Sequence, residues 1–166
     1  MSHLDDRSWK EFKGLGLAKI AQLKAALEIG RRFREDEASA GKQKIGSAKD
    51  VVDILMPQMR DLKTEVFKVV YLDSNNGIIE ITDAAAGTVD HARPIVREIA
   101  HAALQRYAST IVCAHNHPSG RIEPSAHDKE LTNELRNACK YLSIKLLDHL
   151  IVGDNEYFSF KERGLL

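Results

Sequence analysis

The sequence predicts an α/β fold in which a mixed β-sheet is flanked by helices. Short apolar runs typical of buried strands alternate with longer segments whose apolar residues recur at helical spacing. The chain has 166 residues, of which 43% are hydrophobic and 29% are charged, an ordinary composition for a globular protein. This length accommodates one well-packed domain with an appendage. We predict a short helical hairpin over 1–34, a linker over 35–46 and the main domain over 47–166.

The N-terminal part combines a glycine turn with a basic helix. Residues 17–34 are predicted to be helical, and residues 35–46 are polar and small, as in a linker. Residues 10–34 contain seven lysines and arginines but only two glutamates. This segment therefore has a net charge of +5, whereas the formal net charge of the whole chain is zero. The backbone N–H groups around Gly14 and Gly16 can hold a DNA phosphate. A simple turn before a helix explains these glycines equally well.

The main domain is predicted to begin with a helix over about 48–60. Ser47 can cap this helix, and Pro57 would kink it or end it early. Asn76 and Gly77 tolerate a positive φ and can close a hairpin. The expected order is strand 66–72, turn 73–77, strand 78–84, helix 94–107 with Pro94 in its first turn, strand 110–114, helix 125–141, and strands 144–152 and 156–160.

Several features bear on the cellular setting. Cys113 and Cys139 are 26 residues apart and fit neither a disulfide framework nor a C-x-x-C motif, so we expect a reducing, cytoplasmic environment. No apolar run approaches the roughly 20 residues that span a bilayer. The first residues, MSHLDDRSWK, lack the apolar core of a secretory signal. We therefore expect no membrane partner.

Residues 113–128, CAHNHPSGRIEPSAHD, concentrate polar chemistry at the end of a predicted strand. In an extended chain, His115 and His117 point the same way, about 7 Å apart, and can converge on one metal ion. A turn-rich loop then leads to Asp128. Two histidines and one carboxylate leave a fourth tetrahedral position open, which is the layout of a catalytic zinc site.

Other interpretations of this stretch are simpler, or belong to other enzyme classes. Ser125 and Asp128 fit a helix N-terminus, with the serine as cap and the aspartate near the positive end of the helix dipole. That role is compatible with metal binding. The adjacent letters HNH do not indicate an HNH nuclease, which draws its residues from separated positions. Zinc deaminases require a C-x-x-C motif, which this chain lacks.

The spacing His115-x-His117, seven residues, Ser125, two residues, Asp128 resembles the JAMM (MPN+) metalloprotease signature. Together with LLDHLIVG (146–153) and YFSFKERG (157–164), it resembles the RadC family, the bacterial JAMM branch long labelled a DNA-repair protein. The resemblance runs from about residue 47 to the C-terminus and implies a JAMM/MPN-like layering, similar to that of cytidine deaminases. Residues 12–33 resemble the second half of a helix-hairpin-helix region.

The resemblance implies a zinc hydrolase for peptide or isopeptide bonds. His115, His117 and Asp128 would hold one Zn²⁺ per chain. Ser125 would donate a hydrogen bond to the developing oxyanion. The substrate would be a peptide or a protein.

The resemblance also implies a glutamate as general base at the start of the first strand, and Glu65 occupies that position. Composition alone does not choose it over Glu98 or Glu123. His149, within the matched string DHLIVG, is expected to support the site from outside, with a role as fourth ligand as the alternative.

Three functions remain open from the sequence. The first is the zinc hydrolase. The second is a DNA-repair-associated accessory protein with a structural or vestigial zinc site, which would bind DNA weakly and non-specifically through Gly14–Gly16 and the basic helix. The third is a protein-interaction scaffold, against which the complete ligand set argues.

Overall fold

The computed structural model describes residues 16–39, 43–86 and 94–166. The chain divides into two compact units, Met1–Lys42 and Gln43–Leu166. The first contains helix α2 (Leu17–Ser39). The expected helix is thus present, but it continues through residues 35–39, which we had assigned to the linker. Glutamate and alanine in that stretch favour helix, and no proline interrupts it.

Two expectations about the N-terminal unit lie outside the described residues. The expected hairpin around Gly14 is the first of them, and the middle of the expected linker, at residues 40–42, is the second. The hairpin and its DNA contact therefore remain predictions. Among the helices that the structure describes, none is both long and apolar enough to cross a membrane.

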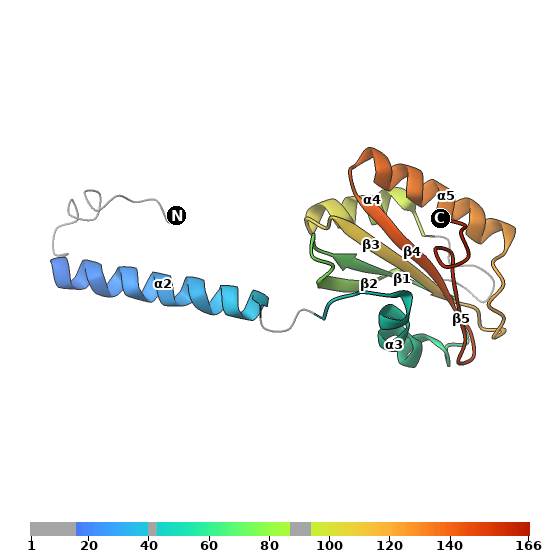
Figure 1. Cartoon of the computed structure of the whole chain (residues 1–166), viewed down its shortest axis with the longest axis horizontal. Coiled ribbons are helices and arrows are strands. Elements are labelled where there is room, and N and C mark those ends of the chain that lie inside the picture. The colour runs from blue at the N-terminus through green and yellow to red at the C-terminus, as the bar shows by residue number, and fades with distance from the viewer. Residues whose placement is uncertain (1–15, 40–42, 87–93) are drawn as a thin grey trace. The chain divides into compact units, whose positions relative to one another are not determined.

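In its described residues, the second unit is a five-stranded mixed sheet with helices on both faces (Figure 1), which confirms the predicted fold class. The strand order is β2-β1-β3-β4-β5, with β3 and β4 parallel and the other neighbours antiparallel. The strands are β1 (Val66–Leu72), β2 (Ile78–Ala86), β3 (Thr110–Asn116), β4 (Lys145–Val152) and β5 (Tyr157–Ser159), and the helices are α3 (Ala48–Met59), α4 (Val96–Gln105) and α5 (Ala126–Tyr141).

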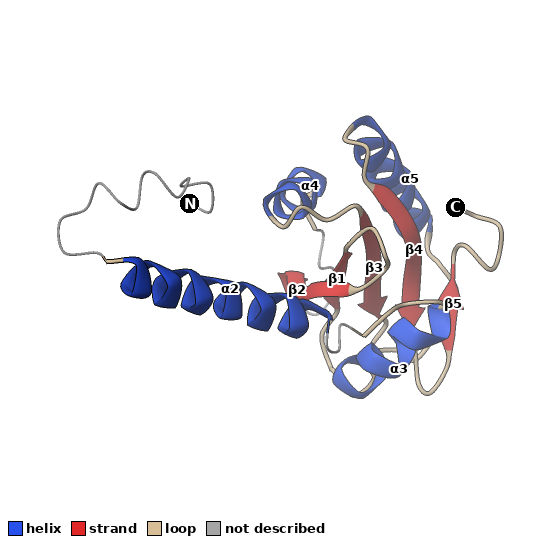
Figure 2. Cartoon of the chain, turned by 60° about the vertical axis from the view of Figure 1, so that its left-hand side comes forward, coloured by secondary structure: helices blue, strands red, loops and turns tan. Residues whose placement is uncertain are grey.

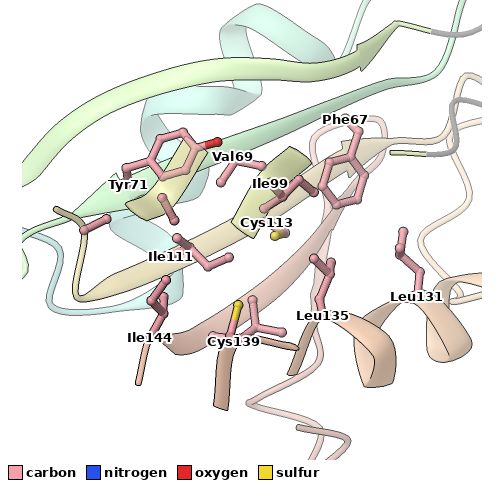
Figure 3. Packing of buried hydrophobic residues seen from close by; sticks show 13 residues of the cluster. Phe67, Val69, Tyr71, Ile99, Ile111, Cys113, Leu131, Leu135, Cys139 and Ile144 are labelled. Atoms are coloured by element: carbon pink, nitrogen blue, oxygen red, sulfur yellow. The ribbon is translucent and has the colours of Figure 1, made fainter. Parts of the chain in front are cut away.

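Alternation along the central strands divides the core between the two faces of the sheet. Helix α3 covers one face, while α4 and α5 cover the other (Figure 2). In β3, Val112 and Ala114 pack in the cluster that includes α3, whereas Ile111 and Cys113 pack in the cluster with α4 and α5. Figure 3 shows this second cluster, in which Leu135 of α5 lies below the sheet residues. The next odd residue of β3 is His115, so the alternation directs it to the α5 side.

Several boundaries differ from the sequence prediction, and three of them concern a proline or a candidate ligand. Helix α3 continues for two residues beyond Pro57, because the proline removes only the one hydrogen bond to residue 53, while the apolar face of the helix stays buried as far as Met59. Helix α4 begins at Val96 with Ile95 as its N-cap, so Pro94 precedes the helix instead of lying in its first turn. Strand β3 extends to Asn116, which places His115 inside the strand.

Candidate metal centre

The last residues of β3 and the first turn of α5 bring three candidate ligands together. His115 lies within β3 and is fully buried, and its ring stacks on Phe67 of β1 with 6.0 Å between ring centroids. His117 follows the strand and is half-buried. Asp128 is the third residue of α5 and is only 5% exposed. Strand β3 thus supplies one imidazole, the residue just after it supplies the other, and the helix supplies the carboxylate.

The two imidazole nitrogens and the carboxylate oxygens lie at separations close to those of a tetrahedral metal centre, with each histidine nearest to a different oxygen of Asp128. The two histidine Nε2 atoms lie 3.1 Å apart. His115 Nε2 is 3.3 Å from Asp128 Oδ1, and His117 Nε2 is 3.6 Å from Asp128 Oδ2. Bonds of 2.0–2.1 Å to a tetrahedral zinc ion place ligand atoms about 3.3 Å apart. Among the residues that the structure describes, these three form a group able to hold a metal ion.

A backbone carbonyl fixes the orientation of His117. Its Nδ1 lies 2.8 Å from the carbonyl oxygen of Arg121. A carbonyl oxygen only accepts hydrogen bonds, so Nδ1 carries the proton and donates it. In the neutral ring, the lone pair is therefore on Nε2, which faces Asp128. Metal-binding histidines are commonly held by such a bond on the far side of the ring.

A buried chain of hydrogen bonds fixes His115 in the same way. The hydroxyl of Thr132 donates to the Asp128 carbonyl oxygen, so its oxygen accepts from His149 Nδ1 at 2.6 Å. Burial holds the pKa of His149 well below its ordinary value, so this ring is neutral and its Nε2 has a lone pair. His149 Nε2 therefore accepts from His115 Nδ1 at 3.0 Å, which leaves the lone pair of His115 on Nε2.

The centre consequently brings two imidazole lone pairs and a negatively charged carboxylate close together, and these electron-rich groups repel one another. A proton or a metal cation between them removes the repulsion. Burial alone would raise the pKa of Asp128, but the hydrogen bond from Ser125 and the attraction that either histidine would exert once protonated at Nε2 outweigh burial, and they hold that pKa well below its usual range. The hydrogen bond to Asp128 raises the pKa of His117, and the negative charge of Glu65 acts in the same direction. The donor set and its charge fit a divalent metal ion.

Ser125 and Asp128 form the helix cap that the sequence also suggested. Asp128 N–H donates to Ser125 Oγ at 3.1 Å, and Ser125 N–H donates to Asp128 Oδ2 at 2.7 Å, which completes a capping box. The Ser125 hydroxyl also donates to Asp128 Oδ2 at 2.7 Å. The cap therefore orients the carboxylate toward the histidines, and the two interpretations of this pair describe one arrangement.

The loop after His117 is held by a close backbone approach at Gly153, which sequence reasoning did not single out. A Cβ atom on Gly153 would lie 2.5 Å from the Gly120 carbonyl oxygen and 2.6 Å from a methyl group of Ile122. Gly120 itself has φ +76°, a conformation that L side chains rarely adopt. The absence of side chains at both positions lets the loop pack against the end of β4, and this packing places the Arg121 carbonyl beside His117.

Of the remaining predicted site residues, Glu65 lies immediately before β1 and is half-buried, whereas Glu98 and Glu123 are exposed. His149 lies behind His115 rather than among the three clustered ligands, as the sequence led us to expect. Thr132 was missed, although its position one helical turn after Asp128 places it on the same face of α5. That spacing is the signal that would have pointed to it.

The ligand set predicts metal binding that depends on each clustered side chain. Wild-type protein incubated with zinc and then desalted should contain about one zinc ion per chain. His117→Ala and Asp128→Ala should each lose it, because two remaining ligands bind weakly. His101→Ala, an exposed histidine on α4, serves as the matched control and should bind normally. Elemental analysis measures the content, and a wild-type protein without metal would contradict this assignment.

The role of His149 predicts that its replacement weakens metal binding without unfolding the domain. The His149 ring lies between Phe67 and Phe160, with ring centroids 5.4 Å and 5.0 Å away, so phenylalanine preserves an aromatic ring in this stack. His149→Phe removes the acceptor for His115 Nδ1, and we expect zinc affinity to fall about 10–100-fold in competition titrations. Phe158→Leu controls for altered packing. Equal affinity in His149→Phe and wild type would refute the role.

Comparison with known proteins places this site in a family. A family model described as RadC-like JAB domain matches residues 45–165. The chain is 43% identical to a UPF0758 protein of Pseudoalteromonas translucida, in an alignment that covers 100% of this chain and 75% of that protein. It is 41% identical to a UPF0758 protein of Clostridioides difficile, covering 99% and 70% of the two chains. The chain belongs to the RadC-like JAB domain family.

Proposed function

We propose that the protein is a zinc-dependent hydrolase of the JAMM type that cleaves peptide or isopeptide bonds. The observation that carries the proposal is the spacing of the His115, His117 and Asp128 ligand atoms, at 3.1–3.6 Å. Three protein ligands leave a fourth position for water or substrate, the arrangement found in catalytic rather than structural zinc sites. Membership of the RadC-like JAB domain family supports the same conclusion.

The donor set is suited to zinc. Two neutral imidazoles and one carboxylate are ligands that zinc accepts in tetrahedral geometry, whereas magnesium and calcium prefer oxygen ligands alone. Bound there, zinc would lower the pKa of its water to about 7 and so supply a nucleophile near neutral pH.

Glu65 would act as the general base. Its position before β1 and its effect on the pKa of His117 support a carboxylate that faces the site. Glu65 would accept a proton from the attacking water as oxygen bonds to the carbonyl carbon. It would then deliver that proton to the leaving nitrogen when the C–N bond breaks, which yields a carboxylate and an amine.

Ser125 would stabilise the negative charge that develops on the carbonyl oxygen. Its hydroxyl, which donates to Asp128 Oδ2, would turn toward that oxygen. The backbone bonds of the capping box hold the helix terminus in place while the hydroxyl moves, because they do not require the serine proton. The serine therefore can serve both as cap and as oxyanion donor.

The cysteines favour a cytoplasmic location for this enzyme. Cys113 and Cys139 are both buried and unpaired. Burial raises the pKa of Cys139 to about 11, so this thiol stays protonated and unreactive at neutral pH. Two reduced, buried thiols are typical of a reducing compartment.

One observation favours a second candidate, a DNA-associated accessory function. Residues 10–34 have a net charge of +5, which would attract phosphate groups. Binding of that kind would be non-specific and would weaken steeply with salt. In this alternative, the metal centre would stabilise the domain without performing hydrolysis.

The glutamate substitution Glu65→Gln tests the hydrolase proposal. The variant removes the base but keeps the shape of the side chain, so hydrolysis should fall by about 10²–10⁴-fold while zinc content and thermal unfolding stay unchanged. Activity would be sought by mass spectrometry in a peptide library and in isopeptide-linked protein conjugates. Glu98→Gln, an exposed glutamate on α4, is the matched control.

Two results would count against the proposal in different ways. Full activity in Glu65→Gln would reject this glutamate as the base. Zinc-loaded wild-type protein that cleaves none of these substrates, yet binds duplex DNA at low salt, would favour the accessory function.

A further inference from the structure

Asn116 lies between the two candidate histidine ligands, but its side chain belongs to a different set of contacts. The residue is only 1% exposed. Alternation along β3 directs it away from the face that bears His115 and toward the side where Val112 and Ala114 pack against α3. A carboxamide in such an apolar setting needs hydrogen-bond partners, because an unpaired buried polar group destabilises the fold.

The partners of Asn116 are the backbone groups on either side of Glu65. Asn116 Oδ1 accepts from the Val66 N–H at 2.8 Å. Asn116 Nδ2 donates to the Thr64 carbonyl oxygen at 3.0 Å. These partners precede Asn116 by 50 and 52 residues. One side chain thus brackets Glu65 from a strand that is remote in sequence.

This contact begins where the sheet pairing stops. The register between β1 and β3 ends at the pair Phe67 and His115. Past that pair, the Asn116 carboxamide takes the place of the next backbone partner. A carboxamide suits the task because one planar group offers both a donor and an acceptor, whereas a carboxylate offers acceptors only.

We propose that Asn116 is a positioning residue that fixes the backbone at Glu65 relative to His115 and His117. The inference rests on the proposed function, in which Glu65 is the general base. Because Asn116 is the residue between both ligands, the strand that places the metal ligands also places the base.

The experiment uses the full chain loaded with Co²⁺, whose visible absorption reports its coordination and changes with pH. The midpoint of that change is measured for wild type, Glu65→Gln, Asn116→Ala and the double variant. Glu65→Gln removes a negative charge beside the site and should lower the midpoint by about one pH unit. Asn116→Ala should also lower the midpoint, but by less than Glu65→Gln does. Asn137→Ala, an exposed asparagine on α5, is the matched control and should match wild type.

The double variant separates positioning from a general structural effect. If Asn116 acts through Glu65, the double variant should have the same midpoint as Glu65→Gln alone. Additive shifts, or a wild-type midpoint in Asn116→Ala, would overturn the inference while leaving the base intact. An unchanged midpoint in Glu65→Gln would instead reject Glu65 as the general base of the proposed function. The inference about Asn116, which depends on that base, would then be rejected as well.

Amide hydrogen exchange in the wild-type protein keeps the inference testable if Asn116→Ala does not fold. The Val66 amide, which precedes the paired register of β1 and β3, should exchange as slowly as the sheet amides, because Asn116 Oδ1 holds it. Asn116→Leu, which is similar in size but offers no acceptor to the Val66 N–H, should speed this exchange. A Val66 amide that exchanges at the rate of an unstructured chain in wild type would overturn the inference.

Discussion

The candidate metal centre is governed by one electrostatic constraint, the meeting of two imidazole nitrogens and a carboxylate at separations of 3.1–3.6 Å. The far side of each ring is already committed, because His117 Nδ1 donates to a carbonyl and His115 Nδ1 donates to His149. Both rings therefore turn a lone pair toward Asp128. Such an arrangement is unfavourable unless positive charge lies between the atoms, and a divalent metal ion supplies more of it than one proton does. The fold keeps these groups together before any metal ion binds, although they repel one another.

Each side chain of the centre is supported by a separate part of the domain. The buried chain through His149 and Thr132 joins β4 to α5 behind His115. The backbone contact at Gly153 supports the loop that orients His117. Such surrounding contacts usually determine how tightly a metal site binds, because they fix the ligand orientation before the ion arrives. The site is therefore a property of the layered sheet and helices, and not of the sixteen-residue motif alone.

Much of this could be predicted from local sequence rules. The spacing of His115 and His117 predicted their convergence, because extended chains alternate strictly, and Asn76 in the predicted turn has a φ of +59°, as expected. Contacts between residues far apart in sequence did not follow from local composition, although the family resemblance suggested a supporting role for His149. Nothing in local composition indicates that His149 lies behind His115, since strand register creates that contact. Helix α2 extends beyond its predicted end at residue 34, because the polar segment that follows also contains glutamate and alanine, which favour helix.

The central claim is that these three side chains hold one metal ion in a catalytic geometry. The most direct measurement is X-ray diffraction from crystals soaked in zinc, with data collected on both sides of the zinc absorption edge. The account predicts an anomalous peak within about 2.0–2.2 Å of His115 Nε2, His117 Nε2 and an Asp128 carboxylate oxygen, with the fourth position filled by solvent. Two results would contradict it. One is the absence of an anomalous peak at this site in crystals that bind zinc at other positions, and the other is an ion whose four coordination positions are all filled by protein atoms.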